Sequence, residues 1–325
     1  MELNRDWLPL QRKLMRDVTR FFDDAPQVGI NINRYALVDA AQVPELRSAA
    51  FLARPFHHVS LFSLTQENGI ARYGPLLIPV DAGPGSDVVR RVVRAMRHGW
   101  TVSWLSSPLA MDDLADHLAG HLNGELADGK DVLVRYYDPR LLAAFIAHLD
   151  EQTKTALLGP VCQWAWWDRH LSLVTVKGGN TSKSACIKQT NISAVTQKAM
   201  AAAAKNDLFN SALLEDSEPD EFSSWLPHTL YHAVCRQVVR AEKLGLKEPA
   251  DLVLFISLAL RVYPDFFDAL PNFARKKHSL ALGEIDMATL ALGVLDDDWN
   301  LLGRTGPAAN PPNLAASLLS TASDS

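Results

Sequence analysis

Hydrophobic runs that each end on an aspartate divide the first half of the chain. The runs are YALVD, LLIPVD, VLVRYYD and WAWWD, and they end at Asp39, Asp81, Asp138 and Asp168. Short apolar runs bounded by turn-forming residues are typical of buried strands. Because ligands commonly bind where the strands of an α/β sheet end, these four aspartates are the first candidate site.

Large and small side chains alternate in WTVSWL, which begins at Trp100 and predicts a strand. In SSPLAMDDLADHLAGHLNG, which follows, apolar residues recur at three- and four-residue spacing, as in an amphipathic helix packed on a sheet. We expect this helix to begin at Ser107 and Pro108 and to end at Gly124. DVLVRYYD supplies the next strand, so the order strand, helix, strand predicts a right-handed crossover between parallel strands.

Two further patterns extend the prediction. Asp138 followed by Pro139 is a helix-start signal, since an aspartate caps the first turn and proline suits the first helical position. WAWWDRHLSLVTV places strand-like runs on both sides of Asp168, which predicts an antiparallel hairpin.

The composition changes after Val176. Residues 177–193 are small, polar and basic, which is typical of a linker. The pattern beyond them is helical, with prolines and glycines between segments near 194–210, 223–244, 249–262 and 284–301. The sequence therefore predicts three parts: an α/β domain with a mixed sheet and crossover helices over 1–176, an all-α helical domain over 194–302, and a disordered tail over 303–325.

Composition and charge narrow the function. The chain has 325 residues, 48% of them hydrophobic, and its 32 basic and 37 acidic residues include no basic block typical of nucleic-acid binding. The N-terminal segment lacks the uninterrupted apolar stretch of a secretory signal. The longest strongly apolar run, Leu252 to Leu260, is less than half of the roughly 20 residues that cross a bilayer. We therefore expect a cytoplasmic protein with neither a nucleic-acid nor a membrane partner.

Several histidines and cysteines are candidate metal ligands. His228, His232 and Cys235 share one side of a helix, but no fourth ligand and no CxxC pair accompany them, so we favour packing. His117 and His121 have the same spacing as an HExxH helix without its glutamate, which favours a solvated helix flank. The cysteines, Cys162, Cys186 and Cys235, are few and odd in number, which suits reduced thiols.

The aspartates leave one enzymatic alternative open. Asp39, Asp81 and Asp138 would hold a divalent cation if their strands were parallel neighbours, which would make the protein a divalent-metal-dependent hydrolase. Helix capping and turn formation explain the aspartates more simply, as separate structural positions. The GGNTSKS loop lacks the second glycine of a phosphate-binding loop, and no GxSxG motif is present. We therefore expect no catalytic residue, metal or cofactor.

Five segments resemble, in order, the conserved domain of the type VI secretion effector chaperones, also called adaptor proteins. They are YALVDAAQVPEL, YGPLLIPVD, GWTVSWLSSPLAMDDLADHLAGHL, DGKDVLVRYYDPRLLAAFI and LLGPVCQWAWWD, and the resemblance covers about residues 33–170. GLKEPADLVLFISLALRVYPDFF is similar to the family's more variable C-terminal region. The resemblance implies a non-catalytic cytoplasmic protein that binds a toxin effector and helps attach it to the VgrG spike.

The family has no assigned catalytic residues to transfer to this chain. The positions that match its motifs are Tyr35, Asp39, Arg135, Tyr136, Asp138 and Pro139. For effector binding we expect exposed apolar surface on the helical domain, around Trp225, Tyr231, Phe266 and Phe267.

Overall fold

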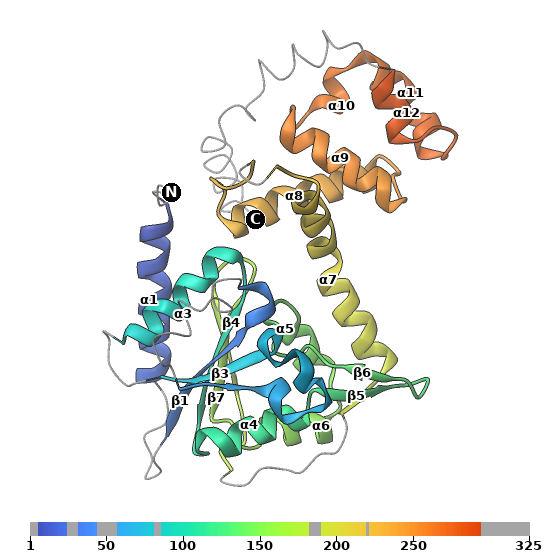
Figure 1. Cartoon of the computed structure of the whole chain (residues 1–325). Helices are drawn as coiled ribbons and strands as arrows, with labels where there is room; N and C mark the ends of the chain where they lie inside the picture. The colour runs from blue at the N-terminus through green and yellow to red at the C-terminus, as the bar shows by residue number, and fades with distance from the viewer. Residues whose placement is uncertain are drawn as a thin grey trace. The chain divides into compact units, whose positions relative to one another are not determined.

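The chain forms a region of strands and helices followed by an all-helical region, which confirms the predicted fold class (Figure 1). The structure is a computed structural model that describes residues 6–24, 32–43, 57–80, 86–181, 190–218 and 221–293. Its contacts divide the chain into two compact units, Met1–Ala204 and Lys205–Ser325. The predicted tail over 303–325 lies outside the described residues.

Two sheets form the framework of the first unit. The larger has the order β2-β3-β1-β4-β7-β8, and every neighbouring pair is antiparallel. Its strands are β1 (Asn33–Asp39), β2 (Val59–Ser60), β3 (Pro75–Pro79), β4 (Val102–Ser107), β7 (Gln163–Trp167) and β8 (Leu173–Lys177). The smaller sheet consists of β5 (Asn123–Leu126), which is antiparallel to β6 (Asp131–Leu133) and parallel to β9 (Thr190–Ile192). Strand β9 falls within the segment predicted to be a linker.

The predicted crossover between parallel strands is wrong. Helix α4 (Met111–Gly120) leads from β4 into β5, and the segment DVLVRYYD contributes only β6, which pairs in the other sheet. The reason is the turn around Gly129, whose φ of 79° closes a β5–β6 hairpin that the pattern did not reveal. Helix α4 also begins later than predicted, because Ser107 belongs to β4 and its hydroxyl donates to the carbonyl of Pro160 at 2.6 Å.

The larger sheet is covered on both faces. Alternate strand residues, including Leu37, Leu105 and Trp164, pack with helices α4, α5 (Pro139–His148) and α6 (Glu151–Leu158). Their neighbours face the opposite way, where the ring of Trp104 meets those of Trp167 and Phe22 at centroid distances of 6.2 and 6.0 Å. Phe22 belongs to α1 (Trp7–Asp23), which packs against α3 (Asp87–Ala95).

Short 3₁₀ segments and one tight hairpin complete the first unit. The segments are η1 (Ala40–Gln42), η3 (Leu61–Leu64), η4 (Gln66–Tyr73) and η5 (Met96–His98). The hairpin predicted around Asp168 is confirmed, with β7 antiparallel to β8. The Asp168 carboxylate accepts from the backbone N–H groups of His170 and Ser172, both at 2.9 Å, so this aspartate has a structural task in the turn.

Six helices are described from residue 194 onwards. They are α7 (Ala194–Glu215), α8 (Pro227–Lys243), α9 (Pro249–Arg261), α10 (Phe266–Ala269), α11 (Pro271–Ala281) and α12 (Met287–Leu292). Helices α10 and α11 were missed because Pro264 and Pro271 were interpreted as breaks. Pro271 instead occupies the first turn of α11, where a missing N–H costs nothing. No helix among the described residues is long and apolar enough to cross a membrane.

Candidate functional site

Asp39 is a buried carboxylate at the end of the central strand β1. Its side chain accepts hydrogen bonds from the backbone N–H of Ala41 at 3.1 Å and from the amide of Gln42 at 2.6 Å. It therefore caps η1, the short helix that follows, as the sequence pattern predicts. Its residual exposure is 0%, so a charge there requires a partner inside the protein.

Asp138 is the matching carboxylate at the start of α5. It caps the helix by accepting from the backbone N–H of Arg140 at 3.0 Å, and Pro139 lies in the first turn, so this predicted helix start is confirmed. The Arg140 guanidinium adds a two-pronged contact, with Nε 2.9 Å from Oδ1 and Nη2 2.7 Å from Oδ2. A bidentate pair of this kind combines charge with fixed geometry.

Arg135 joins the two carboxylates. Its Nη2 atom donates to Oδ2 of Asp39 at 3.0 Å and lies 3.5 Å from Oδ2 of Asp138. Two aspartates that the sequence pattern had separated into independent structural positions thus share one guanidinium, and that interpretation is corrected. We call Asp39, Arg135, Asp138 and Arg140 the Asp–Arg network.

The environment of Arg135 favours its charged state. Burial acts to lower the pKa of Arg135, but Asp39, Tyr137 and Asp138 outweigh it, and the pKa is raised. Burial and the charge of Asp39 raise the pKa of Tyr137 to about 12, and the Arg135 guanidinium lies 5.9 Å from the Tyr137 ring centroid. The phenol therefore stays neutral beside the ions.

Two motif tyrosines brace the surrounding elements. The Tyr35 hydroxyl donates to the carbonyl of Leu109 at 2.8 Å, and the Tyr136 hydroxyl donates to that of Leu118 at 2.6 Å. Both rings are buried, and together they tie β1 to the segment just before α4 and the turn before α5 to the last turn of α4. All six positions that carry the family resemblance are thus engaged in holding this part of the fold.

The chemistry open to the Asp–Arg network is limited by its hydrogen bonds. Each carboxylate already accepts from an arginine and from a backbone N–H, so neither is placed as a free base or nucleophile. Asp81, the third residue of the metal hypothesis, lies outside the described residues. Within the described ranges, no group of three or more His, Cys, Asp or Glu side chains is arranged to hold a metal ion.

The His117 and His121 pair is not a solvated helix flank, which corrects that interpretation. Both side chains are buried, with ring centroids 5.0 Å apart. His117 Nε2 lies 3.0 Å from the carbonyl of Leu157 in α6, and His121 Nδ1 lies 3.3 Å from the hydroxyl of Thr190 in β9. Burial and then the proximity of His117 lower the pKa of His121 to about 3. The pair is therefore neutral and links α4 to two neighbouring elements.

The second histidine cluster packs within the helical region. Burial, followed by the effect of His232, lowers the pKa of His228 to about 4. The thiol of Cys235, which is partly buried and in no disulfide, accepts from the side-chain amide of Asn206 at 3.2 Å. Cys162 is buried and likewise in no disulfide, while Cys186 lies outside the described residues.

The apolar surface expected around Trp225, Tyr231, Phe266 and Phe267 is largely internal. Phe266 and Phe267 are 0% and 1% exposed, because their rings pack against Phe255 and Phe273 in the core of the helical region. Tyr231 is also buried, and Trp225 is half-buried. The expected exposure is therefore wrong for three of the four.

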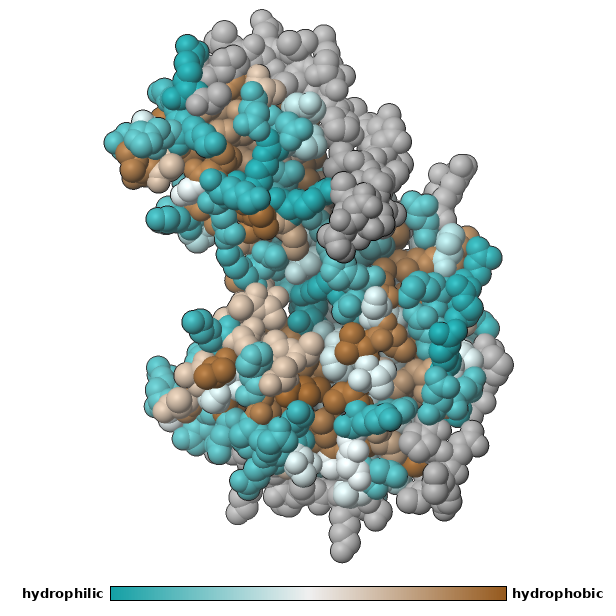
Figure 2. All heavy atoms as spheres, turned by 180° about the vertical axis from the view of Figure 1, so that it is seen from behind, coloured by the Kyte–Doolittle hydropathy of each residue, from teal (hydrophilic) through white to brown (hydrophobic). Residues whose placement is uncertain are grey.

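Other hydrophobic side chains occupy the surface instead. Hydrophobic residues lie among hydrophilic ones on the face shown in Figure 2. The large exposed ones in the described part of the helical region are Val195, Leu208, Leu214, Val239, Leu282 and Leu292. A direct role of the four predicted residues in partner binding stays a prediction.

Comparison with known proteins identifies one domain. Residues 34–156 match a family model described as "Domain of unknown function (DUF4123)", so the chain contains a DUF4123 domain. The match covers less than half of the 325 residues and includes every member of the Asp–Arg network. No curated protein and no solved structure matches the chain.

Sequence reasoning missed the ion pairs of the two arginines. Arg135 was named only as a position that matches the family's motifs and Arg140 was not named, although both lie within three residues of Asp138 in the segment RYYDPR. The signal lay in that segment, since two cations flanking a carboxylate favour an ion-paired helix start. Arg135 and Asp39 are 96 residues apart in the sequence, so no local sequence pattern could predict their contact.

Proposed function

We propose that this protein is a non-catalytic chaperone, or adaptor, of type VI secretion. In the cytoplasm it binds a toxin effector and promotes the loading of that effector onto the VgrG spike. The observation that carries the proposal is that the two most specific motifs of the family resemblance, YALVDAA and VLVRYYDPR, meet through Arg135. The DUF4123 match, which spans both motifs, gives further support.

The Asp–Arg network suits a binding protein better than an enzyme. It contains two carboxylates and two guanidiniums, so it is neutral overall, and its hydrogen bonds hold strand β1 to the start of α5. Such a network fixes the relative positions of elements that support the surface, and a preformed surface loses less free energy on binding a partner. The motif residues then support the binding surface without contacting the effector themselves.

The alternative, a divalent-metal-dependent hydrolase using Asp39, Asp81 and Asp138, has one observation in its favour. Asp39 and Asp138 face the same guanidinium. A cation at that position would have to displace arginines from the carboxylate oxygens. Metal analysis and hydrolase assays of wild type and an Asp39→Asn, Asp138→Asn double variant examine this alternative. Bound divalent metal and an activity that the double variant loses would replace the adaptor proposal.

The test of the adaptor role uses the full chain and purified partners. We expect the purified chain to copurify with the toxin and the VgrG protein that are encoded beside its gene. We also expect deletion of the gene to abolish delivery of that toxin while the toxin is still made. A deletion strain complemented with the chain is the control. If the purified chain captures neither protein and its deletion leaves delivery intact, the proposal is wrong.

A further inference from the structure

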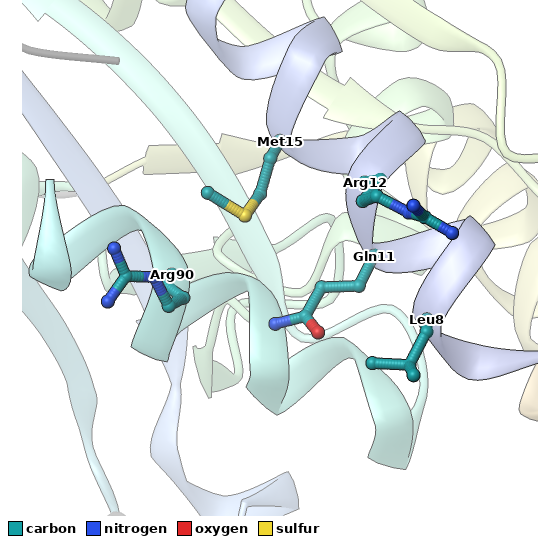
Figure 3. Close-up of a pocket in the computed structure, with 5 residues that line it drawn as sticks. All are labelled: Leu8, Gln11, Arg12, Met15 and Arg90. Atoms are coloured by element: carbon teal, nitrogen blue, oxygen red, sulfur yellow. The ribbon is translucent and has the colours of Figure 1, made fainter. Parts of the chain in front are cut away.

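Helices α1 and α3 form a surface groove that the Asp–Arg network does not use. It has a volume of about 310 Å³ and is lined by Leu8, Gln11, Arg12, Met15 and Arg90 (Figure 3). The four α1 residues fall at positions i, i+3, i+4 and i+7, so they lie on one side of the helix. Arg90 belongs to α3, and in this view its guanidinium extends away from α1, so the charged groups of Arg12 and Arg90 lie at the two sides of the groove.

The floor of the groove is apolar. Leu8 is 49% exposed and Met15 is partly buried, although the stripe of α1 that packs into the core is a separate one, which includes Trp7, Leu14 and Val18. The apolar area at Leu8 therefore adds little to the core and remains available at the surface. The volume is at the lower end of the roughly 300–1,000 Å³ of small-molecule pockets, which suits one or two side chains better than a cofactor.

The charges at the groove have one sign. Both charged lining residues are arginines, and α1 and α3 together carry seven basic and three acidic side chains in a chain of net charge −5. Two of the three acids already pair with local cations: Asp17 with Lys13 at 2.7 Å, and Asp87 with Arg91 at 2.7 Å and Arg90 at 3.4 Å. Exposed pairs of this kind are weak, so an incoming carboxylate competes for Arg90.

We propose that this groove binds an acidic segment of the effector. An apolar side chain of that segment lies between Leu8 and Met15, and neighbouring carboxylates pair with Arg12 and Arg90. This proposal rests on the proposed adaptor function and names the chemistry of the partner. Charge complementarity selects an acidic segment, and the apolar floor requires at least one leucine, isoleucine or methionine within it.

The test compares two charge-reversed variants of the full chain. Arg12→Glu with Arg90→Glu changes the groove, while Arg20→Glu with Arg94→Glu makes the same charge change on exposed positions of the same helices outside it. The probes are the purified effector and an array of 15-residue peptides tiled across it. Circular dichroism and thermal unfolding of each variant establish that it is folded. If the groove variant unfolds, Arg12→Gln with Arg90→Gln replaces it.

We expect the groove variant to weaken effector capture at least ten-fold and the control variant to weaken it less than two-fold. The array peptides that bind should be acidic and carry an apolar residue, and their binding should fall as NaCl rises from about 50 to 300 mM because exposed ion pairs are screened. Equal capture by wild type and the groove variant, or binding confined to neutral or basic peptides, would overturn the groove proposal alone.

Two other outcomes are separable. If wild type captures no effector, the adaptor function fails, and the groove proposal fails with it. If wild type elutes as a dimer and the groove variant as a monomer, a second copy of this chain occupies the groove, and the effector proposal is overturned. Light scattering of both proteins at several concentrations distinguishes these cases.

Discussion

At the residue scale, Arg135 is the cation that lies between two buried carboxylates, those of Asp39 and Asp138. Replacing it by methionine keeps much of the side-chain volume but leaves Asp39 buried without its cation. Removing one partner of a buried ion pair typically costs about 3–5 kcal/mol. Because the Arg135 side chain is 43% exposed, water offsets part of this loss, and we expect Arg135→Met to lower the free energy of unfolding by about 2–3 kcal/mol. Urea denaturation measures the change.

A double-mutant cycle separates the ion pair from other effects. We expect Asp39→Asn with Arg135→Met to be less destabilising than the sum of the single changes, since neither charge is then left alone. Lys130→Met is the matched control, because Lys130 pairs with Asp128 on an exposed hairpin, and its loss should change the free energy of unfolding little. If Arg135→Met is as stable as Lys130→Met, the network does not stabilise the fold.

The sequence predicted the roles of the two aspartates in helix capping but not the contact that joins them. Asp138 beside Pro139 and Asp39 at the end of its strand were correctly expected to lead into helices, because capping depends on neighbours in the sequence. The link between them was not expected. It depends on how β1 and the turn before α5 meet in three dimensions, and periodicity contains no information about that contact.

The buried pair His117 and His121 gives a pH-dependent prediction. Burial and the nearby His117 lower the pKa of His121 to about 3, whereas the unfolded chain has the ordinary value of about 6.5. The unfolded state therefore binds more protons between those values, and stability falls as the pH drops below about 6.5. From pH 7 to pH 5 we expect a loss of about 2 kcal/mol from this group.

Substitution of the histidine tests that assignment. In His121→Leu the titrating group is gone, so the loss of stability between pH 7 and pH 5 should shrink by about the same 2 kcal/mol. Urea titrations at both pH values measure it, and His57→Gln, at an exposed histidine in the same unit, is the comparison variant. An unaltered pH dependence of stability in His121→Leu would mean that the pKa of His121 is not lowered in the folded state.

At the scale of elements, Gly124 controls the contact between β5 and β9. A Cβ atom at this position would lie 2.5 Å from the Val134 side chain and 2.9 Å from the carbonyl of Thr190. Overpacking of this kind costs about 1–3 kcal/mol, so Gly124→Ala should destabilise the unit and loosen β9. Faster hydrogen exchange at residues 190–192 would report it. Gly69→Ala is the control, since nothing lies within 4 Å of its Cβ position; equal exchange in both variants would contradict the prediction.

Elements were predictable where the local pattern alone decides the structure. Met111, Leu114 and Leu118 of α4 recur at helical spacing and are buried as expected. Strand pairing failed because β5 and β6 form a local hairpin that the pattern did not reveal, and because β5 also pairs with β9, which is distant in the sequence. Pro271 was misread for a different reason, since proline both ends helices and begins them, and only the residues that follow distinguish the two roles.

At the scale of the whole molecule, the two units have cores that share no residue. One core surrounds Leu105, Trp164 and other residues of the larger sheet, and another surrounds Phe255 and Phe267 in the helical region. Where apolar burial is divided in this way, each unit has its own source of stability. A destabilising change should therefore act mainly on the unit that contains it.

Phe267→Ala tests whether the two units are stabilised by separate cores. Phe267 is 1% exposed, and removal of a buried phenylalanine side chain typically costs about 3–5 kcal/mol. We expect hydrogen exchange to accelerate across α9–α11 while β1, β4 and β7 keep their protection. Leu292→Ala, at 87% exposed, should change neither. If Phe267→Ala instead accelerates exchange equally in both units, they unfold as one cooperative body. Loss of effector capture in Phe267→Ala would then report global unfolding, because this ring lies in the core and not at the surface.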